Sequence, residues 1–169
     1  MEGRVLPYLA LWIAAGPAAA LAEKVNVDFD QDADFSRFKT FYINEGQLNS
    51  KNPSLNSDLV RKKIQAEIRK RLMEKGLSEV TQGQNLNVRF SLGSSPRKEV
   101  DVYPTRWYGA RRVVTRYTEG TLVIDLRDTS QRALVWRAVA EEDGSPSHIN
   151  DKIDDMVKKS FEKYPPKKK

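Results

Sequence analysis

Cysteine is absent from this 169-residue chain, and histidine occurs once. Without cysteine we expect no disulfide framework, no thiolate zinc site, no cysteine nucleophile and no lipid-bearing cysteine. The single histidine, His148, lies near Ser145, Ser147 and Asp151, but no glycine-flanked nucleophile elbow accompanies it. We therefore interpret His148 as an exposed side chain at a polar helix entry rather than as a catalytic base.

Charged residues are scarce at positions 1–22. Arg4 precedes the uncharged run Val5–Ala22, which ends in Ala20-Leu21-Ala22, the small-x-small pattern that signal peptidase cleaves. Two prolines and a glycine interrupt the run, so its helical part is shorter than the roughly 20 apolar residues of a membrane span. We predict a signal peptide cleaved after Ala22, a periplasmic location, and a single domain at 23–169 without a transmembrane helix.

The net charge of +6 is spread over the chain and includes a short basic tail, Lys167-Lys168-Lys169. Such a charge attracts anionic lipid, envelope polymers or nucleic acid through a field that salt screens. No compact basic stripe interleaved with aromatic residues is visible, so we expect no nucleic-acid partner. The charges are interpreted as a solvated surface, with an envelope protein or an anionic cell-wall or lipid component as possible partners.

Two stretches between residues 121 and 140 show the clearest strand pattern. Apolar residues alternate with polar ones in each stretch, which is typical of strands with one buried face. Asp128-Thr129-Ser130-Gln131 supplies turn residues between the two strands. The predicted inward positions are Leu122, Ile124 and Leu126 in the first strand, and Leu134, Trp136, Ala138 and Ala140 in the second.

Other strands are predicted at 25–29, 38–43, 86–92 and 113–117, where apolar, aromatic and branched residues recur. Residues 44–57 are polar and contain Asn52-Pro53, which indicates a loop. Residues 93–112 contain two glycines and two prolines and are predicted to be irregular.

Two helices have apolar residues at four-residue spacing, which gives each a single buried stripe. The first begins at a cap on Asn56 or Ser57 and ends near Gly76, where a left-handed residue is favoured. The second is predicted to be capped by Ser147 and is stopped by Pro165-Pro166. The stripes are Val60, Ile64, Ile68 and Leu72, and Ile149, Ile153, Val157 and Phe161.

These elements predict an α+β fold. Strands outnumber helices, and each helix has one apolar stripe, so we expect a mainly antiparallel, twisted sheet of five to six strands with both helices on one face. The unit at 38–92 can hold a strand–helix–strand crossover between parallel strands.

Five segments occur in an order that carries a family resemblance: Asp34–Phe41, Lys75-Gly76-Leu77, Glu119–Asp125, Leu134–Arg137 and Tyr164-Pro165-Pro166. Together they resemble the bacterial domain-of-unknown-function family 4136, a group of exported envelope proteins. Many members look like lipoproteins with a lipid-bearing cysteine, which this chain lacks. The resemblance implies no catalytic residues.

Acidic residues cluster at three places without forming a recognisable site. Asp28, Asp30, Asp32 and Asp34 resemble a calcium loop, but Ala33 and Lys39 stand where that loop needs glycine and glutamate. We therefore interpret this segment as a strand and a turn, with no metal.

A glycosidase needs two carboxyl groups that flank its substrate. Asp125 and Asp128 are three residues apart in a strand and are expected to point to opposite faces. Glu141, Glu142 and Asp143 are interpreted as a solvated strand end. No phosphate-cradling glycine loop is present, and no cofactor is expected.

The segment at 103–112 is the predicted binding surface, because aromatic residues and arginine dominate binding hot spots. The alternative is that its rings fold back and cover an open end of the sheet. The residues concerned are Tyr103, Arg106, Trp107, Tyr108, Arg111 and Arg112.

The sequence therefore predicts a non-enzymatic periplasmic accessory protein that binds an envelope protein or a cell-wall polymer. The alternative is a hydrolase of envelope glycans or lipids whose carboxylates are not identified.

Overall fold

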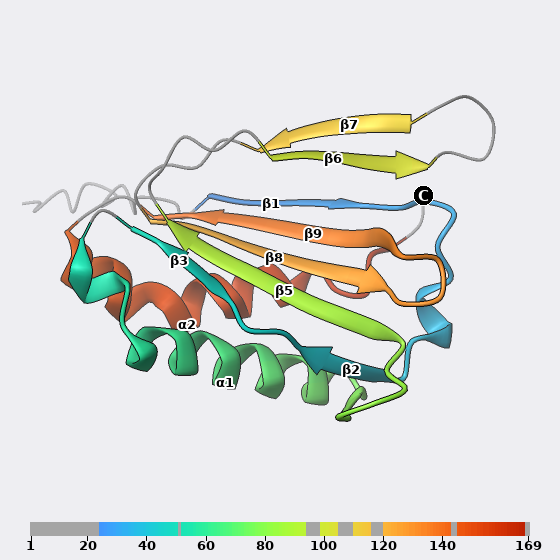
Figure 1. Ribbon diagram of the computed structural model, residues 1–169, viewed down its shortest axis with the longest axis horizontal. Helices are drawn as coiled ribbons and strands as arrows, with labels where there is room; N and C mark the ends of the chain where they lie inside the picture. The colour runs from blue at the N-terminus through green and yellow to red at the C-terminus, as the bar shows by residue number, and fades with distance from the viewer. Residues whose placement is uncertain are drawn as a thin grey trace, which may run out of the picture.

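The structure is a computed structural model in which a sheet forms one layer and two helices form the other (Figure 1). It describes residues 24–50, 52–93, 99–104, 110–115, 120–142 and 145–167, and for 99–104 and 110–115 the backbone alone. The predicted signal peptide lies outside the described residues. No helix within the described residues is long and apolar enough to cross a membrane.

Seven strands of the described chain form the sheet, in the order β1-β9-β8-β5-β2-β4, with β3 also paired to β5. β1, β9, β8 and β5 pair with one another antiparallel, whereas β2 and β3 run parallel to β5, and β4 runs parallel to β2. The strands are β1 (Lys24–Phe29), β2 (Thr40–Ile43), β3 (Gln47–Asn49), β4 (Ser78–Glu79), β5 (Leu86–Gly93), β8 (Thr121–Asp128) and β9 (Ala133–Glu141).

The prediction of a mainly antiparallel sheet of five to six strands was wrong in two respects, because the sheet is mixed and has seven strands within the described residues. Helix α1 (Asp58–Glu74) separates β2 from β5 and returns the chain to the same end of the sheet. Two neighbouring strands joined in this way run parallel. The α+β class and the position of both helices on one face agree with the prediction (Figure 1).

The two helices begin at serine caps. The Ser57 side chain accepts a hydrogen bond from the Val60 amide at the start of α1, so Ser57 is the cap of the two predicted candidates, Asn56 and Ser57. Helix α2 (Pro146–Glu162) is capped by Ser145 and not by Ser147. Pro146 explains this difference, because proline lacks an amide hydrogen and favours the first helical position directly after the cap.

The core lies between the helices and the sheet, and both predicted apolar stripes are buried in it. At the end of α1, Gly76 has a φ of +85°, and the Leu77 amide donates to the Leu72 carbonyl. This is the predicted left-handed helix end. The inward residues of the sheet include Leu122, Ile124, Leu126, Trp136, Ala138 and Ala140.

A β-bulge separates Leu134 from Trp136. Leu126 is paired with Trp136, but its neighbour Arg127 is paired with Leu134, so Val135 is an extra residue in β9. Leu134 therefore lies on the same face as Arg127, opposite the core face of Trp136. The predicted alternation was right for Trp136 and wrong for Leu134, because a period of two cannot reveal an inserted residue.

Two predicted irregular segments contain strands. Residues 99–104 and 110–115 form the antiparallel pair β6 (Glu99–Pro104) and β7 (Ala110–Thr115), which lies on the side of the molecule away from the helices (Figure 1). β7 includes the start of the strand predicted at 113–117.

The predicted loop at 44–57 contains β3 and a 3-10 turn, η2 (Pro53–Leu55). A second such turn, η1 (Phe35–Arg37), follows β1.

Candidate functional site

Charged side chains form a row across the face of the sheet that the helices leave uncovered. The strand register places Arg89 of β5 beside Asp125 of β8, Asp125 beside Arg137 of β9, and Arg137 beside Asp28 of β1. Each alternates along its strand with residues that point into the core. The row therefore has alternating positive and negative charges.

Arg137 and Asp125 form a bidentate ion pair in the middle of this row. The Arg137 Nε and Nη2 atoms each lie 2.6 Å from one carboxylate oxygen of Asp125. Their side chains are 2 % and 14 % exposed. Parallel hydrogen bonds of this kind fix both groups and leave the pair electrically neutral.

A hollow of about 620 Å³ lies beside this pair, on the same face of the sheet. Its position follows from an interruption between β2 and β3. Ile43 is paired with Val88, and Gln47 is paired with Ser91, so three residues lie opposite two residues of β5 and the chain bends. The lining residues are Asn44, Glu45, Gln47, Arg89, Phe90, Ser91, Val123, Asp125 and Arg127.

Gly46 lies at this interruption because no other residue fits there. A Cβ atom on Gly46 would lie 2.0 Å from the Cε2 and Cζ atoms of the Phe90 ring. Phe90 is 4 % exposed and belongs to the core. The absence of a side chain at Gly46 thus lets the Phe90 ring pack from the core side against the backbone between β2 and β3.

Arg89 is exposed in the hollow and makes no hydrogen bond or ion pair with the residues that the structure describes. Its register neighbour Asp125 is already bound by Arg137. Arg127 lies two residues from Asp125 on the same face and also lines the hollow. Two guanidinium groups with amide and hydroxyl neighbours are suited to binding a carboxylate or a phosphate group.

The two carboxylates that line the hollow are each engaged by an arginine. Asp125 is held by Arg137, and the Glu45 Oε1 atom lies 3.4 Å from Arg61 Nη1. A glycosidase needs one carboxyl group that donates a proton and a second that acts as base or nucleophile. The described contacts give neither carboxylate such a role.

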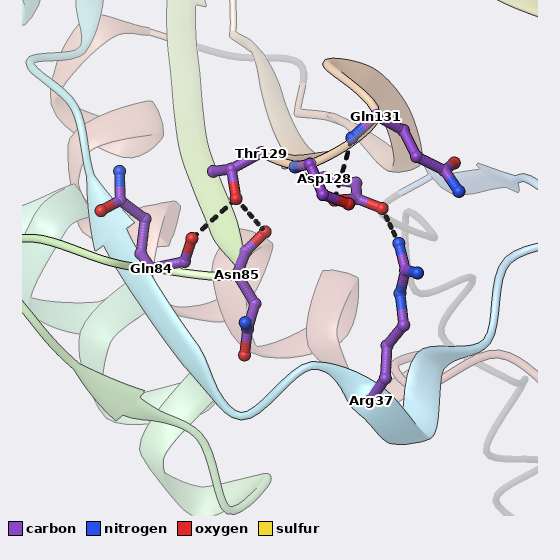
Figure 2. Close-up of polar contacts among 7 residues, drawn as sticks. Arg37, Gln84, Asn85, Asp128, Thr129 and Gln131 are labelled. Carbon is purple, nitrogen blue, oxygen red and sulfur yellow. Dashed lines mark hydrogen bonds and ion pairs between the residues drawn. The ribbon is translucent and has the colours of Figure 1, made fainter.

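Asp128 belongs to a different cluster, at the end of β8 (Figure 2). Its carboxylate is 3 % exposed and forms an ion pair with Arg37 of η1. It also accepts hydrogen bonds from the Ser130 amide at 2.8 Å and the Ser130 hydroxyl at 2.7 Å. Asp125 and Asp128 therefore serve different arginines, and Asp128 holds the β8–β9 turn against η1.

Thr129 and Asn85 extend this cluster to β2 (Figure 2). The Thr129 hydroxyl donates to the Gln84 carbonyl at 2.7 Å, and its amide donates to the Asn85 carbonyl at 3.0 Å. The Asn85 side chain accepts from the Lys39 amide at 2.9 Å. These bonds join three loops at one end of the sheet, which is a structural role.

His148 is 45 % exposed, and its Nε2 atom lies 2.9 Å from Glu142 Oε1. The prediction of an exposed side chain is confirmed. The Ser145 hydroxyl accepts from the His148 amide as a helix cap, which is a structural role. At the other acidic segment, Asp30 accepts from the Asp32 amide within a turn. The described residues contain no group of three metal-ligating side chains.

The predicted binding segment lies largely outside what the structure describes. Tyr103 and Arg111 are register partners in β6 and β7, and Arg112 follows in β7, with their backbone alone described. Arg106, Trp107 and Tyr108 fall outside the described residues. Their binding role stays a prediction, and only the two ends of the segment, 103–104 and 110–112, belong to the described strands β6 and β7.

Sequence reasoning missed Arg89 as a site residue. The signal was present, because Asn87, Arg89 and Ser91 are the polar positions of the predicted strand at 86–92. Such positions normally point to solvent. The pattern could not reveal that Asp125, the register neighbour of Arg89, forms its ion pair with Arg137, two strands away from Arg89.

Comparison with solved structures finds proteins of similar fold. A crystal structure of a DUF4136 family protein from Bacteroides thetaiotaomicron superposes with a TM-score of 0.63 at 16% identity, covering 85% of this chain and 96% of the other. A PelC dodecamer from Paraburkholderia phytofirmans gives 0.50 at 16% identity, covering 83% and 95%. A PDZ domain protein from Parabacteroides distasonis gives 0.51 at 16% identity, covering 87% and 37%.

These likenesses, all at low identity, show a shared fold. A comparison with curated proteins found no match. The model of the family described as a domain of unknown function, DUF4136, matches residues 25–166, which are nearly all of the described chain. The chain therefore belongs to the DUF4136 family.

Proposed function

We propose that the protein is a non-enzymatic accessory protein of the bacterial envelope that binds an anionic cell-wall polymer in the hollow on the helix-free face. The observation that carries this proposal is Arg89, an exposed guanidinium in a polar hollow with no partner among the described residues. Arg127 adds a second positive charge on the same face. The predicted signal at 1–22 supports an envelope location.

Sugar carboxylates suit this site because guanidinium groups bind carboxylates in two parallel hydrogen bonds. Asn44, Gln47 and Ser91 line the same hollow and offer donors and acceptors for sugar hydroxyls. No contact among the described residues favours the hydrolase alternative, since Asp125 and Glu45 are each engaged by an arginine.

The test is a calorimetric titration of the protein with a soluble oligomer of galacturonate, and a separate titration with inorganic phosphate. Arg89→Gln should weaken binding of the preferred anion about 10- to 100-fold, since a hydrogen bond to a charged group contributes about 1.5–3 kcal/mol. Lys158→Gln on α2 removes the same charge from the opposite side of the sheet and should leave the affinity unchanged. Equal losses in both variants, or no binding of either anion, would show that the hollow is not an anion site.

A further inference from the structure

The outward face of α1 carries five exposed residues in one line. They fall within about 80° of the helix circumference at 3.6 residues per turn. All five are exposed, whereas the opposite stripe of α1 is buried in the core. We call this line the α1 stripe; it consists of Leu59, Lys62, Ala66, Lys70 and Met73.

The ends of the α1 stripe are apolar. Leu59 is 78% exposed and Met73 is 56% exposed, and with Tyr42 they are the exposed large hydrophobic residues of the described chain. They lie about four helical turns apart, or about 21 Å. This spacing along a straight helix suits contact with an extended surface.

The two lysines of the stripe have no carboxylate partner among the described residues, although the other four cations of α1 each have one. Arg61 binds Asp58 at 2.6 Å, and Lys63 lies 3.9 Å from Asp154. Arg69 is paired with Glu79 at 2.5 Å, and Arg71 with Glu74 at 3.0 Å and with Glu67. The acidic residues of α1 thus form ion pairs with arginines beside the stripe, and Lys62 and Lys70 have no ion-pair partner among the described residues.

We propose that the α1 stripe docks the protein onto an anionic lipid surface. Two ammonium groups meet the lipid phosphates, while Leu59 and Met73 reach the headgroup region, which is how peripheral helices combine charge with apolar contact. A second copy of this chain is a poorer occupant. Helix α2 offers Asp151, Asp154 and Asp155, but the described part of α2 exposes no large apolar side chain that could cover Leu59 and Met73.

Docking through α1 would also orient the hollow beside Arg89. Both helices lie on one face of the sheet (Figure 1). Arg89, which lines the hollow, alternates along β5 with the core residues Val88 and Phe90 and so lies on the other face. A protein held to lipid by α1 therefore presents the hollow away from the membrane. The docking proposal does not depend on the anion-binding proposal, because the two surfaces share no residue.

The test is flotation of the protein with vesicles of phosphatidylcholine alone or mixed with phosphatidylglycerol. All variants carry the same full chain, so any contribution of residues 1–22 is common to them. Lys62→Gln with Lys70→Gln should weaken binding to phosphatidylglycerol vesicles about 30-fold, at about 1 kcal/mol for each lysine. Leu59→Ser with Met73→Ser should also weaken it.

The control is Lys39→Gln with Arg132→Gln, which removes the same charge at exposed positions outside α1. It should bind like the wild type. An equal loss in this control would overturn the proposal, since attraction would then follow net charge alone. So would unchanged binding in the lysine variant. If Leu59→Ser with Met73→Ser instead dissociates an oligomer in sedimentation velocity and leaves flotation unchanged, the stripe is a contact between copies and the lipid proposal is wrong.

Discussion

Trp136 lies at the centre of an aromatic cluster that joins the sheet to the end of α2. Its ring stacks on Phe161 with centroids 5.2 Å apart and meets Tyr164 edge-on at 5.6 Å. Its exposed fraction is 0%, and its indole Nε1 has no hydrogen-bond partner in the described structure. The side chain thus contributes through packing and carries the cost of a buried, unpaired donor.

We expect Trp136→Ala to lower the free energy of unfolding by about 3–5 kcal/mol, because it removes a large buried side chain and leaves a cavity. Trp136→Phe should cost clearly less, since it keeps an aromatic ring and removes the unpaired N–H. Urea denaturation of both variants measures the difference. A Trp136→Ala variant as stable as the wild type would contradict the burial of this residue.

Tyr164 is expected to make the free energy of unfolding depend on pH in the alkaline range. Burial raises the pKa of the Tyr164 hydroxyl above its ordinary value of about 10. The folded protein therefore keeps this proton to a higher pH than the unfolded chain does. The contribution of the protonated Tyr164 hydroxyl to the free energy of unfolding is therefore complete below about pH 10. It falls as the pH rises further, because the tyrosine of the unfolded chain then loses its proton while that of the folded protein keeps it.

Thermal unfolding between about pH 9 and pH 11 tests this effect by comparing the wild type with Tyr164→Phe. The wild type should lose stability more steeply with rising pH than the variant, which has no proton to lose at this position. The other tyrosines are common to both proteins. Parallel curves would show that Tyr164 is not the group responsible.

Among the elements, the interruption between β2 and β3 decides the shape of the hollow. Gly46→Ala should lower the free energy of unfolding by about 1–3 kcal/mol, because the added methyl group would overlap the Phe90 ring. Phe90→Leu should recover part of this loss in the double variant, since it removes the atoms that clash. Chemical denaturation of the two single variants and the double variant gives the coupling. Strictly additive costs would place Gly46 away from Phe90.

Ser145 and Ser147 at the start of α2 have different roles, because only Ser145 is the helix cap. Ser145→Ala should cost about 0.5–2 kcal/mol of stability, because the Ser145 side chain accepts a hydrogen bond from the His148 amide at the helix start. Ser147→Ala, already inside the helix, should change stability far less. Thermal melting of the two variants under identical conditions provides the measurement. A larger loss for Ser147→Ala would restore the cap predicted from sequence.

For the whole molecule, export is the property that residues 1–22 predict most directly. If this segment is a cleaved signal, the protein isolated from the periplasm should begin at Glu23, because Ala20 and Ala22 fit the small side-chain pockets of signal peptidase. Intact mass spectrometry of the exported protein measures this start. A periplasmic form that retains Met1 would contradict cleavage.

Local patterns in the sequence determined the elements whose formation depends on nearby residues. The stripes of α1 and α2, the start of α1 at Asn56 or Ser57 and the left-handed Gly76 need contacts within one helix or one turn, so spacing and residue type reveal them. The inward phase of Leu122, Ile124 and Leu126 follows in the same way from a period of two. The family resemblance also rested on such local segments and was confirmed.

Only the tertiary structure decided which strands are neighbours and which charges meet. The parallel crossover from β2 through α1 to β5, which the sequence allowed at 38–92, is present. The pairing of β3 with β5 and of β4 with β2, however, leaves no trace in local periodicity. The extra residue at Val135 reversed the predicted face of Leu134. The site depends on the same long-range order, since the register of β5, β8 and β9 puts Asp125 between Arg89 and Arg137 and commits it to one of them.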